Sequence, residues 1–318
     1  MKPLVSILIP CYNADQWLAD TVKSALAQTW DNTEIIVVDD GSTDGSLAIA
    51  QSFEAANLKV ISQPNQGASA ARNRALRTAQ GDFIQYLDAD DLLALDKIER
   101  QIELLLNHQN CIAAGAWARF YRSIDEATFK PEPVWQEMLP VDWLICSWEG
   151  GGMMHPAAWL APRAIVEAAG LWNENLSLND DGEYFSRVIL ASHQIKFCAG
   201  ARSYYRSGIS GSLSGTTSAA GLVSAFQSLE LCTSYLLNQE NTPRTRHACA
   251  TALQRFIYAT YPDATNLVQK AEKKVHHLGG SDLQPTGGTV FQILANTVGW
   301  KQAKQFQRRF SRSKQCRA

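Results

Sequence analysis

Three carboxylates crowd into four positions at the end of a short apolar run. The stretch FIQYLDADD, residues 83–91, ends with Asp88, Asp90 and Asp91. One of the last two aspartates could cap a helix that begins at Leu92. If Asp88 and Asp90 continue the strand, they share a face, and at ~7 Å their repulsion would be about 2 kcal/mol. A bound Mg²⁺ or Mn²⁺ would remove that repulsion, and so would exposure of the loop to water.

A second acidic cluster, NDDGEYFSR, occupies residues 179–187. If this segment is helical, Glu183 and Arg187 form an i, i+4 ion pair. Asp180 and Asp181 would then lie at the helix N-terminus, where the helix dipole stabilises negative charge. A carboxylate can also act as a general base that removes a proton from a hydroxyl group. The residues alone therefore leave a structural and a catalytic interpretation open.

The spacing of apolar residues predicts the elements that must position these carboxylates. Strands are expected at residues 4–9, 34–39, 58–62 and 83–87, and helices at 14–29, 46–56, 68–79 and 92–105. Asn13 and Gln16 have the spacing of an N-terminal cap for the first helix. Strands and helices that alternate through short connections predict a parallel sheet with helices on both faces.

Polar, turn-forming residues follow three of the predicted strands. They are PCYN at 10–13, DDGS at 39–42 and DADD at 88–91. Ligands bind beyond the carboxyl ends of the strands in such sheets, so these segments should make one site. The first strand leads into PCYNAD rather than a Gly-rich turn, which argues against a dinucleotide-dependent oxidoreductase. The Gly-rich, Lys- or Arg-bearing phosphate loop typical of a nucleotidyltransferase is also absent there.

The regular alternation fades after residue 110. A strand is expected at 111–121, a loop at 131–156, and helices at 163–170 and 180–191. Later composition predicts two or three appended helices and then a Gly-rich linker. The predicted domains are 1–212 (a nucleotide-sugar-binding half, about 1–110, and an acceptor half, about 111–212), a helical appendage at 213–278, and a linker with a basic tail at 279–318.

Composition excludes several classes of protein. The formal net charge of −2 gives no case for nucleic-acid binding. The seven cysteines are dispersed, which argues against a zinc site or disulfide scaffold and fits a reducing cytoplasm. The basic tail, residues 300–318, has seven Lys or Arg and no acid, with Trp300, Phe306 and Phe310 among them. It could lie at the inner face of an anionic membrane or be a solvated, disordered end.

Four segments, in this order and spacing, resemble glycosyltransferase family 2, of the inverting kind with the GT-A fold. They are VSILIPCYN at 5–13, EIIVVDDGSTDGS at 34–46, NQGASAARNRAL at 65–76 and FIQYLDADD at 83–91. The resemblance covers roughly residues 4–210. It implies an α/β, Rossmann-like and mostly parallel sheet with helices on both faces, followed here by the helical appendage.

The resemblance also implies a nucleotide-sugar donor site. In the family, the DxD motif holds Mg²⁺ or Mn²⁺ against the donor diphosphate, so Asp90 is the expected metal ligand and Asp88 a metal or ribose contact. Tyr12 would stack on the base, usually uracil, and Asp40 would accept a hydrogen bond from it. The expected nucleotide contacts are Pro10, Tyr12, Asn13, Asp40, Arg72 and Asp88. The alternatives are a core tyrosine at Tyr12, a turn-former at Asp40 and a solvated helix face at Arg72.

The segment at 179–187 resembles the family's ED motif, with Asp180 in place of the usual Glu and Arg187 six residues after Asp181. This match implies that Asp181 is the general base. Attack by the acceptor oxygen opposite the leaving nucleoside diphosphate would then invert the anomeric configuration. The expected acceptor is a glycan, lipid-linked or other hydroxyl compound.

Three further residues have a possible role in substrate binding. Trp148 is either a sugar-stacking platform or a core residue, and His155 is a donor or acceptor contact or a structural histidine. Arg206 resembles a family position near the diphosphate, although the histidine that often follows is not evident in SGISGS. A non-catalytic nucleotide-sugar-binding protein of the same fold is the alternative function.

Overall fold

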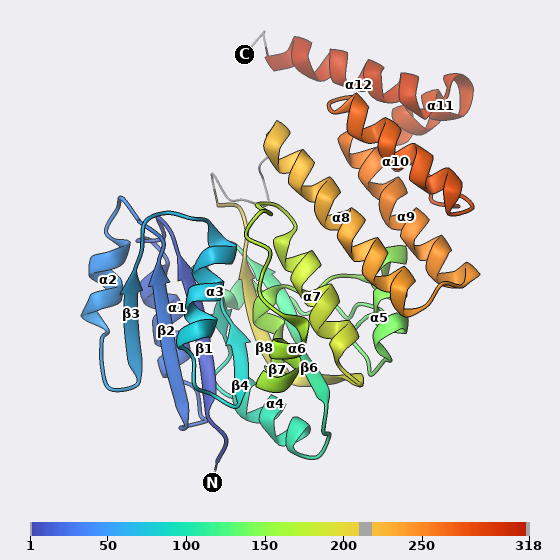
Figure 1. Ribbon diagram of the computed structural model, residues 1–318. Helices are drawn as coiled ribbons and strands as arrows, with labels where there is room; N and C mark the ends of the chain where they lie inside the picture. Colours follow the sequence, from blue (N-terminus) through green and yellow to red (C-terminus); the bar gives the residue numbers. More distant parts are fainter. Residues whose placement is uncertain (1, 210–217, 316–318) are drawn as a thin grey trace.

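The computed structural model describes residues 2–209 and 218–315, with side chains described as far as residue 308. These residues contain an 8-stranded sheet in the order β3-β2-β1-β4-β7-β6-β8-β5. The strands are β1 (Val5–Cys11), β2 (Thr33–Asp39), β3 (Leu58–Ser62), β4 (Phe83–Tyr86), β5 (Leu92–Leu93), β6 (Cys111–Phe120), β7 (Trp159–Pro162) and β8 (Gln194–Arg206). Helices cover both faces of this sheet (Figure 1).

The first four strands in space, β3-β2-β1-β4, are parallel, as the sequence predicts. Every residue of β1 is buried, and its alternate side chains enter two different cores. Ile7 and Ile9 pack in one core with α1 (Leu18–Leu26). Leu8 packs in the other core with α3 (Ala68–Thr78). The two-residue period of the strand therefore places helices on opposite faces.

The rest of the sheet is mixed. β7 is antiparallel to both β4 and β6, and β6 is parallel to β8. The predicted helix at 92–105 is wrong at its start, because β5 pairs with β8 there and α4 spans Lys97–Leu106. Neither Asp90 nor Asp91 can cap that helix.

The predicted cap of the first helix is also wrong. α1 begins at Leu18 with Trp17 at its N-cap position and no side-chain cap. Asn13 has a left-handed φ of 48° and precedes the helix by several residues. The second helix, α2 (Ser46–Ser52), ends earlier than predicted.

Residues 131–156, predicted as a loop, contain helical structure. α5 spans Pro140–Cys146 and is followed by a π-helical turn, Ser147–Gly151. Two short 3₁₀ turns, Ile124–Glu126 and Pro156–Ala158, lie on either side. The predicted helices at 163–170 and 180–191 are confirmed as α6 (Arg163–Ala169) and α7 (Asp180–Ala191).

Three appended helices follow, as predicted: α8 (Ala219–Gln239), α9 (Pro243–Thr260) and α10 (Thr265–His277). They share an apolar core separate from the two sheet cores. α11 (Thr289–Val298) and α12 (Trp300–Gln315) come next, so most of the predicted basic tail is helical rather than disordered. The predicted domain boundary at 212/213 lies outside the described residues, and the domain division stays a prediction. Across the described ranges, every helix is too short or too polar to span a bilayer.

Candidate active site

The three polar strand ends lie side by side. β1 pairs with β2 on one side and β4 on the other, all parallel, so their carboxyl ends share one edge of the sheet. Tyr12 follows β1, Asp40 follows β2 and Asp88 closely follows β4. The sequence prediction that these segments meet is confirmed.

Residues 88–91 form a turn rather than a strand extension. The amide of Asp91 donates to the carbonyl of Asp88 across 3.1 Å. Asp91 is fully buried, and its carboxylate accepts a hydrogen bond from the amide of Arg206 at 2.9 Å. Asp88 and Asp90 keep partial exposure. The turn therefore gives the three aspartates different surroundings, with one inside the protein and two toward solvent.

Asp90 is held in an environment that opposes its negative charge. Burial, then the neighbouring Asp91 and Asp88, raise the pKa of Asp90 to about 7. The side chain of Arg206 reaches this turn, and its Nε donates to the carbonyl oxygen of Asp90 at 2.9 Å. A cation bound at Asp90 would offset the repulsion that raises its pKa.

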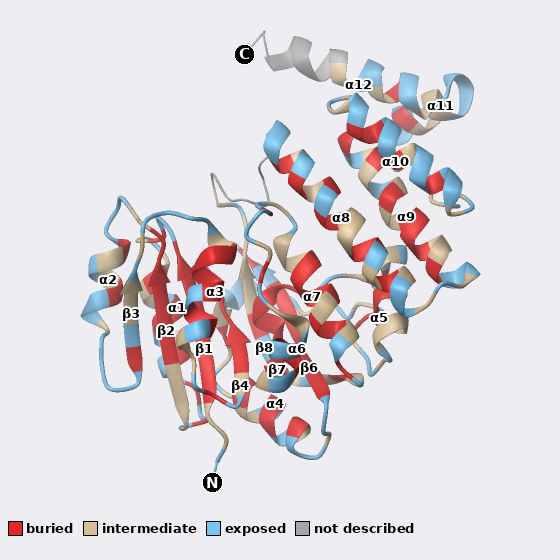
Figure 2. Cartoon of the chain, in the orientation of Figure 1, coloured by how far each residue is buried: buried red, intermediate tan, exposed pale blue. Residues whose placement is uncertain are grey.

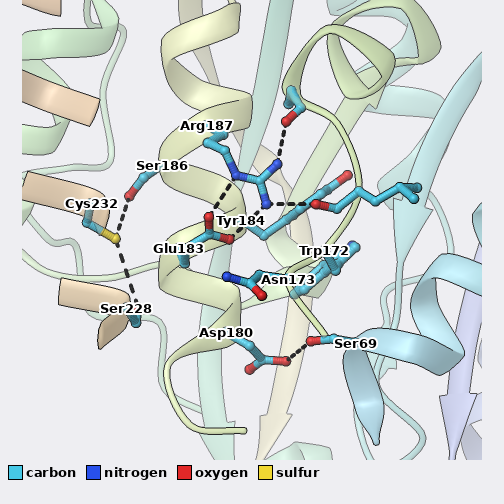
Figure 3. A network of polar contacts seen from close by, with 12 residues as sticks. Ser69, Trp172, Asn173, Asp180, Glu183, Tyr184, Ser186, Arg187, Ser228 and Cys232 are labelled. Carbon is cyan, nitrogen blue, oxygen red and sulfur yellow. Dashed lines mark hydrogen bonds and ion pairs between the residues drawn. The ribbon is translucent and has the colours of Figure 1, made fainter. Parts of the chain in front are cut away.

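Arg72, on α3, joins the two acidic clusters. Its Nη2 lies 2.8 Å from Asp88 Oδ1, and its Nη1 lies 2.8 Å from Asp180 Oδ2. Ser69, one turn earlier on the same helix, donates to Asp180 at 3.0 Å (Figure 3). Arg72 is buried, so the alternative of a solvated helix face is wrong. Residues far apart in the sequence are thus brought together by one guanidinium group.

Trp172 packs against the guanidinium of Arg72 and was not among the predicted site residues. The guanidinium carbon of Arg72 lies 4.3 Å from the Trp172 ring centroid. The Trp172 ring also stacks on the ring of Tyr184, with 4.0 Å between the ring centroids and 10° between the ring planes. Asn73 fixes the backbone of Trp172 by accepting from its amide and donating to its carbonyl, both at 2.9 Å. No periodic pattern in the loop before α7 marks Trp172, so the sequence offered no signal for it.

Asp181 belongs to the second acidic cluster and lies in the first turn of α7. Its Oδ1 accepts from the amide of Gly182 at 2.8 Å. Burial first, and then Asp180, raise the pKa of Asp181 to about 6, with Arg72 acting in the opposite direction. Asp88 also contributes to this rise, so the two clusters share one electrostatic environment. A carboxylate with this pKa is ionised at neutral pH and can accept a proton.

The predicted i, i+4 ion pair between Glu183 and Arg187 is confirmed. Arg187 holds Glu183 with two hydrogen bonds of 2.9 and 2.8 Å. The same guanidinium donates to the carbonyls of Ala169 and Leu171, in the segment that leads to Trp172 (Figure 3). The ion pair therefore ties α7 to the loop that supports Arg72.

Asp40 is buried and has structural partners that the sequence did not reveal. Its carboxylate accepts from Gln63 Nε2 at 2.8 Å and from the amides of Gln66 and Gly67 at 3.0 and 2.7 Å. These bonds fix the loop that leads into α3. A carboxylate has about four acceptor positions, so one remains for a ligand. The expected contact with a base stays a prediction.

The segment after β1 presents Tyr12 to solvent. This side chain is 51% exposed, so the alternative of a core tyrosine is wrong. Pro10 is buried within β1. Asn13 accepts from the amide of Thr43 at 2.8 Å, which joins the ends of β1 and β2. The arrangement leaves one flat aromatic ring available beside the carboxylate cluster.

His155 is buried, with 1% exposure, and both ring nitrogens have partners. Nδ1 lies 2.9 Å from Asp91, and Nε2 lies 2.8 Å from the Ser203 hydroxyl. Burial lowers the pKa of His155 to about 3, so the ring is neutral. This environment fits the structural alternative for His155. Trp148 is partly buried and packs against the core, which fits the core alternative for that residue.

The carboxylates do not form a complete metal cage. Within the described part of the chain, no group of three or more His, Cys, Asp or Glu side chains is arranged to hold a metal ion. Asp90 and the remaining oxygen of Asp88 could supply one or two ligands. Mg²⁺ is commonly bound in this way, by few carboxylates together with substrate phosphates and water.

Comparisons with known proteins agree with this arrangement. The model of glycosyl transferase family 2 matches residues 6–166. An uncharacterized glycosyltransferase of Haemophilus influenzae is 42% identical over 119 residues, which are 36% of this chain and 48% of that protein. TuaG of Bacillus subtilis, named for teichuronic acid biosynthesis, is 44% identical over 108 residues, 33% of this chain and 43% of that protein. The chain thus spans less than half the length of these two curated relatives.

Among solved structures, S. aureus TarS in complex with UDP-GlcNAc is similar, with a TM-score of 0.71 and 18% identity. The likeness covers 86% of this chain and 81% of that one. It confirms the predicted α/β GT-A fold. The family match extends over half of the sequence and includes the four segments that carried the resemblance, apart from Val5 at the start of the first. The chain belongs to glycosyl transferase family 2.

Proposed function

We propose that this protein transfers a sugar from a nucleotide-sugar donor to an acceptor hydroxyl by a single, inverting displacement that requires a divalent cation. The observation that carries the proposal is the bridge of Arg72 between Asp88 and Asp180. The bridge supports the proposal because it joins the Asp88–Asp91 turn, which would hold the cation, to the start of α7, where Asp181 would act as the base. In the proposed reaction, the cation acts on the donor and the base acts on the acceptor, so the two groups must lie close together.

The donor half of the proposal uses the strand ends. Tyr12 would stack on the base, Asp40 would use its remaining acceptor position, and Pro10 and Asn13 would shape the same loop. UDP is the favoured nucleotide, because the similar TarS structure contains UDP-GlcNAc. Arg206, which is fixed to the Asp90 turn, would lie near the diphosphate.

Asp90, with Asp88, would hold the Mg²⁺ or Mn²⁺. When bound, the cation would neutralise charge on the departing diphosphate. Arg72 would keep Asp88 oriented, because it donates a hydrogen bond to Oδ1 of that carboxylate. Oδ2, to which Arg72 does not donate, would face the cation. A proton on Asp90 would compete with the cation, since the pKa of Asp90 is about 7.

Asp181 would remove the proton from the acceptor hydroxyl while that oxygen attacks the anomeric carbon. The bond from the anomeric carbon to the diphosphate oxygen breaks as the new glycosidic bond forms, so an α-linked donor gives a β-linked product. The acceptor is a glycan, lipid-linked or other hydroxyl compound. The name of TuaG supports a cell-envelope polysaccharide as the product class.

The donor half can be tested by thermal unfolding with UDP, with and without Mn²⁺. We expect UDP to raise the unfolding temperature only when the metal is present, and Asp90→Asn to abolish this effect. Asp31→Asn is a matched control, because Asp31 is exposed and its ion pair is with Lys2, which is also exposed. Absence of any metal-linked stabilisation would contradict the proposal.

Asp181→Asn separates the enzyme from a non-catalytic binding protein. The substitution keeps the shape of the side chain and removes its basicity. We expect sugar transfer to fall by about 10²–10⁴-fold, the usual contribution of general base catalysis, while metal-linked UDP binding survives. If the unaltered protein neither transfers nor hydrolyses any donor in a broad panel, the binding-protein alternative is favoured instead.

A further inference from the structure

α11 presents an apolar stripe to solvent. Val290 and Ile293 are 73% and 59% exposed, and their i, i+3 spacing puts them on one side of the helix. Val298, the last residue of the helix, is 49% exposed. Phe291, on an adjacent side, is buried and attaches α11 to the molecule. The helix contains no charged residue. Figure 2 shows α11 as mostly exposed.

The next helix, α12, supplies positive charge. The helix contains six Lys or Arg and no Asp or Glu. Two of these cations are paired with acids of the appended helices and the turn before α10: Lys301 lies 2.6 Å from Glu272, and Arg308 contacts Asp263. Acids within α12 cannot neutralise the others, because the segment has none. An apolar, uncharged helix therefore lies beside a strongly cationic one.

The charge distinguishes between possible occupants of this surface. A two-fold contact between copies of the chain would place each patch against itself, and would bring cationic segments together. A polyanion such as nucleic acid would use the cations but not the apolar stripe. An anionic lipid bilayer matches both features, because apolar side chains enter the boundary below the head groups while Lys and Arg remain among them.

We propose that α11 and α12 form a docking surface for an anionic membrane. The surface lies on the side of the molecule toward which the carboxyl ends of β1 and β2 point (Figure 1). A bound protein would therefore turn its candidate active site toward the bilayer, where a lipid-linked acceptor would be presented. This orientation rests on the proposed function, but the membrane binding itself does not.

Sedimentation with vesicles tests the surface on the full chain without any donor. We expect binding to phosphatidylcholine vesicles that contain phosphatidylglycerol, little binding to pure phosphatidylcholine, and weaker binding at high salt. The double variant Val290→Ser/Ile293→Ser should bind at least about tenfold more weakly, because two apolar side chains no longer enter the bilayer. The matched control Leu95→Ser/Leu106→Ser alters two exposed leucines near α4, far from α11, and should bind normally.

Several results would overturn the proposal. One is equal binding to neutral and anionic vesicles, and another is full binding by the α11 double variant. The third is that the original protein binds no vesicles and is a dimer in light scattering, while the double variant is a monomer. The substituted positions are exposed, so unchanged thermal unfolding will show that the variant is folded. Metal-linked UDP binding is measured separately, so failure at the membrane and failure of the proposed transfer reaction can be distinguished.

Discussion

Two aspartates at the candidate active site have pKa values near neutrality for related reasons. Burial is the largest cause for both, and a neighbouring carboxylate is the second. Both proposed tasks require the ionised carboxylate. Asp90 must lose its proton to hold a cation, while Asp181 must lose its proton to accept one from the acceptor. Because the pKa is about 7 for Asp90 and about 6 for Asp181, acidification should weaken cation binding first and proton removal at lower pH.

The pH dependence of transfer provides a test of Asp181. At saturating donor and metal, we expect the turnover rate to rise about tenfold per pH unit below pH 6 and to level off above it, because only ionised Asp181 is a base. The measurement is kcat for the full chain from pH 4.5 to pH 8. A rate that is independent of pH across about 6, with metal binding saturated throughout, would contradict this role.

Asp90 should make the metal-free protein less stable at high pH. Its pKa is about 7 in the folded protein, against an ordinary value of 3.8, so the folded state disfavours the charged form. The cost is absent below about pH 4, grows as pH rises, and is complete above pH 7. Asp90→Asn should therefore raise the free energy of unfolding by about 1–2 kcal/mol at pH 8, after allowance for partial exposure.

Chemical denaturation at two pH values measures this effect. We expect the variant to be more stable than the original protein at pH 8 in the presence of a chelator, and equal to it near pH 4. Asp31→Asn is again the control, since Asp31 is exposed and its pKa is lowered by Lys2 instead. Equal or lower stability of Asp90→Asn at pH 8 would show that Asp90 is not under electrostatic strain.

At the scale of elements, Arg72 connects three parts of the fold. Its helix, α3, contacts the turn after β4 through Asp88 and the start of α7 through Asp180. Trp172 fills the space beneath the guanidinium, and Tyr184 of α7 lies beneath Trp172. The relative position of the two acidic clusters therefore depends on the planar fork of one arginine.

Arg72→Lys tests this dependence and preserves the charge. A lysine ammonium cannot reach both carboxylates in the fixed geometry of a guanidinium, so we expect at least about a tenfold loss of transfer at saturating donor. Arg74→Lys is the matched control, because Arg74 is exposed on the same helix. Transfer by Arg72→Lys at the original rate would show that the bridge does not position the clusters.

The sequence predicted the parallel half of the sheet because its signals are local. β1 and β2 are largely apolar runs, and their short connections to α1 and α2 allow one arrangement. β5 and β7 are only two and four residues long, and their pairing depends on β8, β4 and β6. The contact of Asn73 with Trp172 joins residues 99 positions apart, and no local pattern encodes it.

Within the site, motif residues were easier to predict than their partners. The two acidic clusters and Arg72 were found from residue types, spacing and family resemblance. The bonds from the 63–67 loop to Asp40 were not, because they come largely from backbone amides, which every sequence has. The burial of His155 could not be predicted from the sequence either, because it depends on how β8 passes the turn that contains Asp91.

At the scale of the whole molecule, the appended helices support the candidate active site directly. Ser228 of α8 donates to the carbonyl of Asn179 at 2.7 Å and accepts from its side chain at 2.8 Å. Ser224 accepts from the amides of Ser177 and Leu178 at 2.8 and 3.0 Å. These bonds fix the segment just before Asp180 and Asp181, so α8 takes part in positioning the proposed base.

Ser228→Ala should therefore affect catalysis from outside the sheet. The substitution removes the hydroxyl that bonds the side chain and the carbonyl of Asn179, although that carbonyl keeps a 3.3 Å bond from the amide of Glu183. We expect about 1–2 kcal/mol lower stability. We also expect a several-fold lower kcat with unchanged metal-linked UDP binding, because the donor contacts lie on the strand ends. Ser234→Ala, at an exposed position of the same helix, is the matched control. A variant that loses stability but transfers sugar at the original rate would restrict α8 to a structural role.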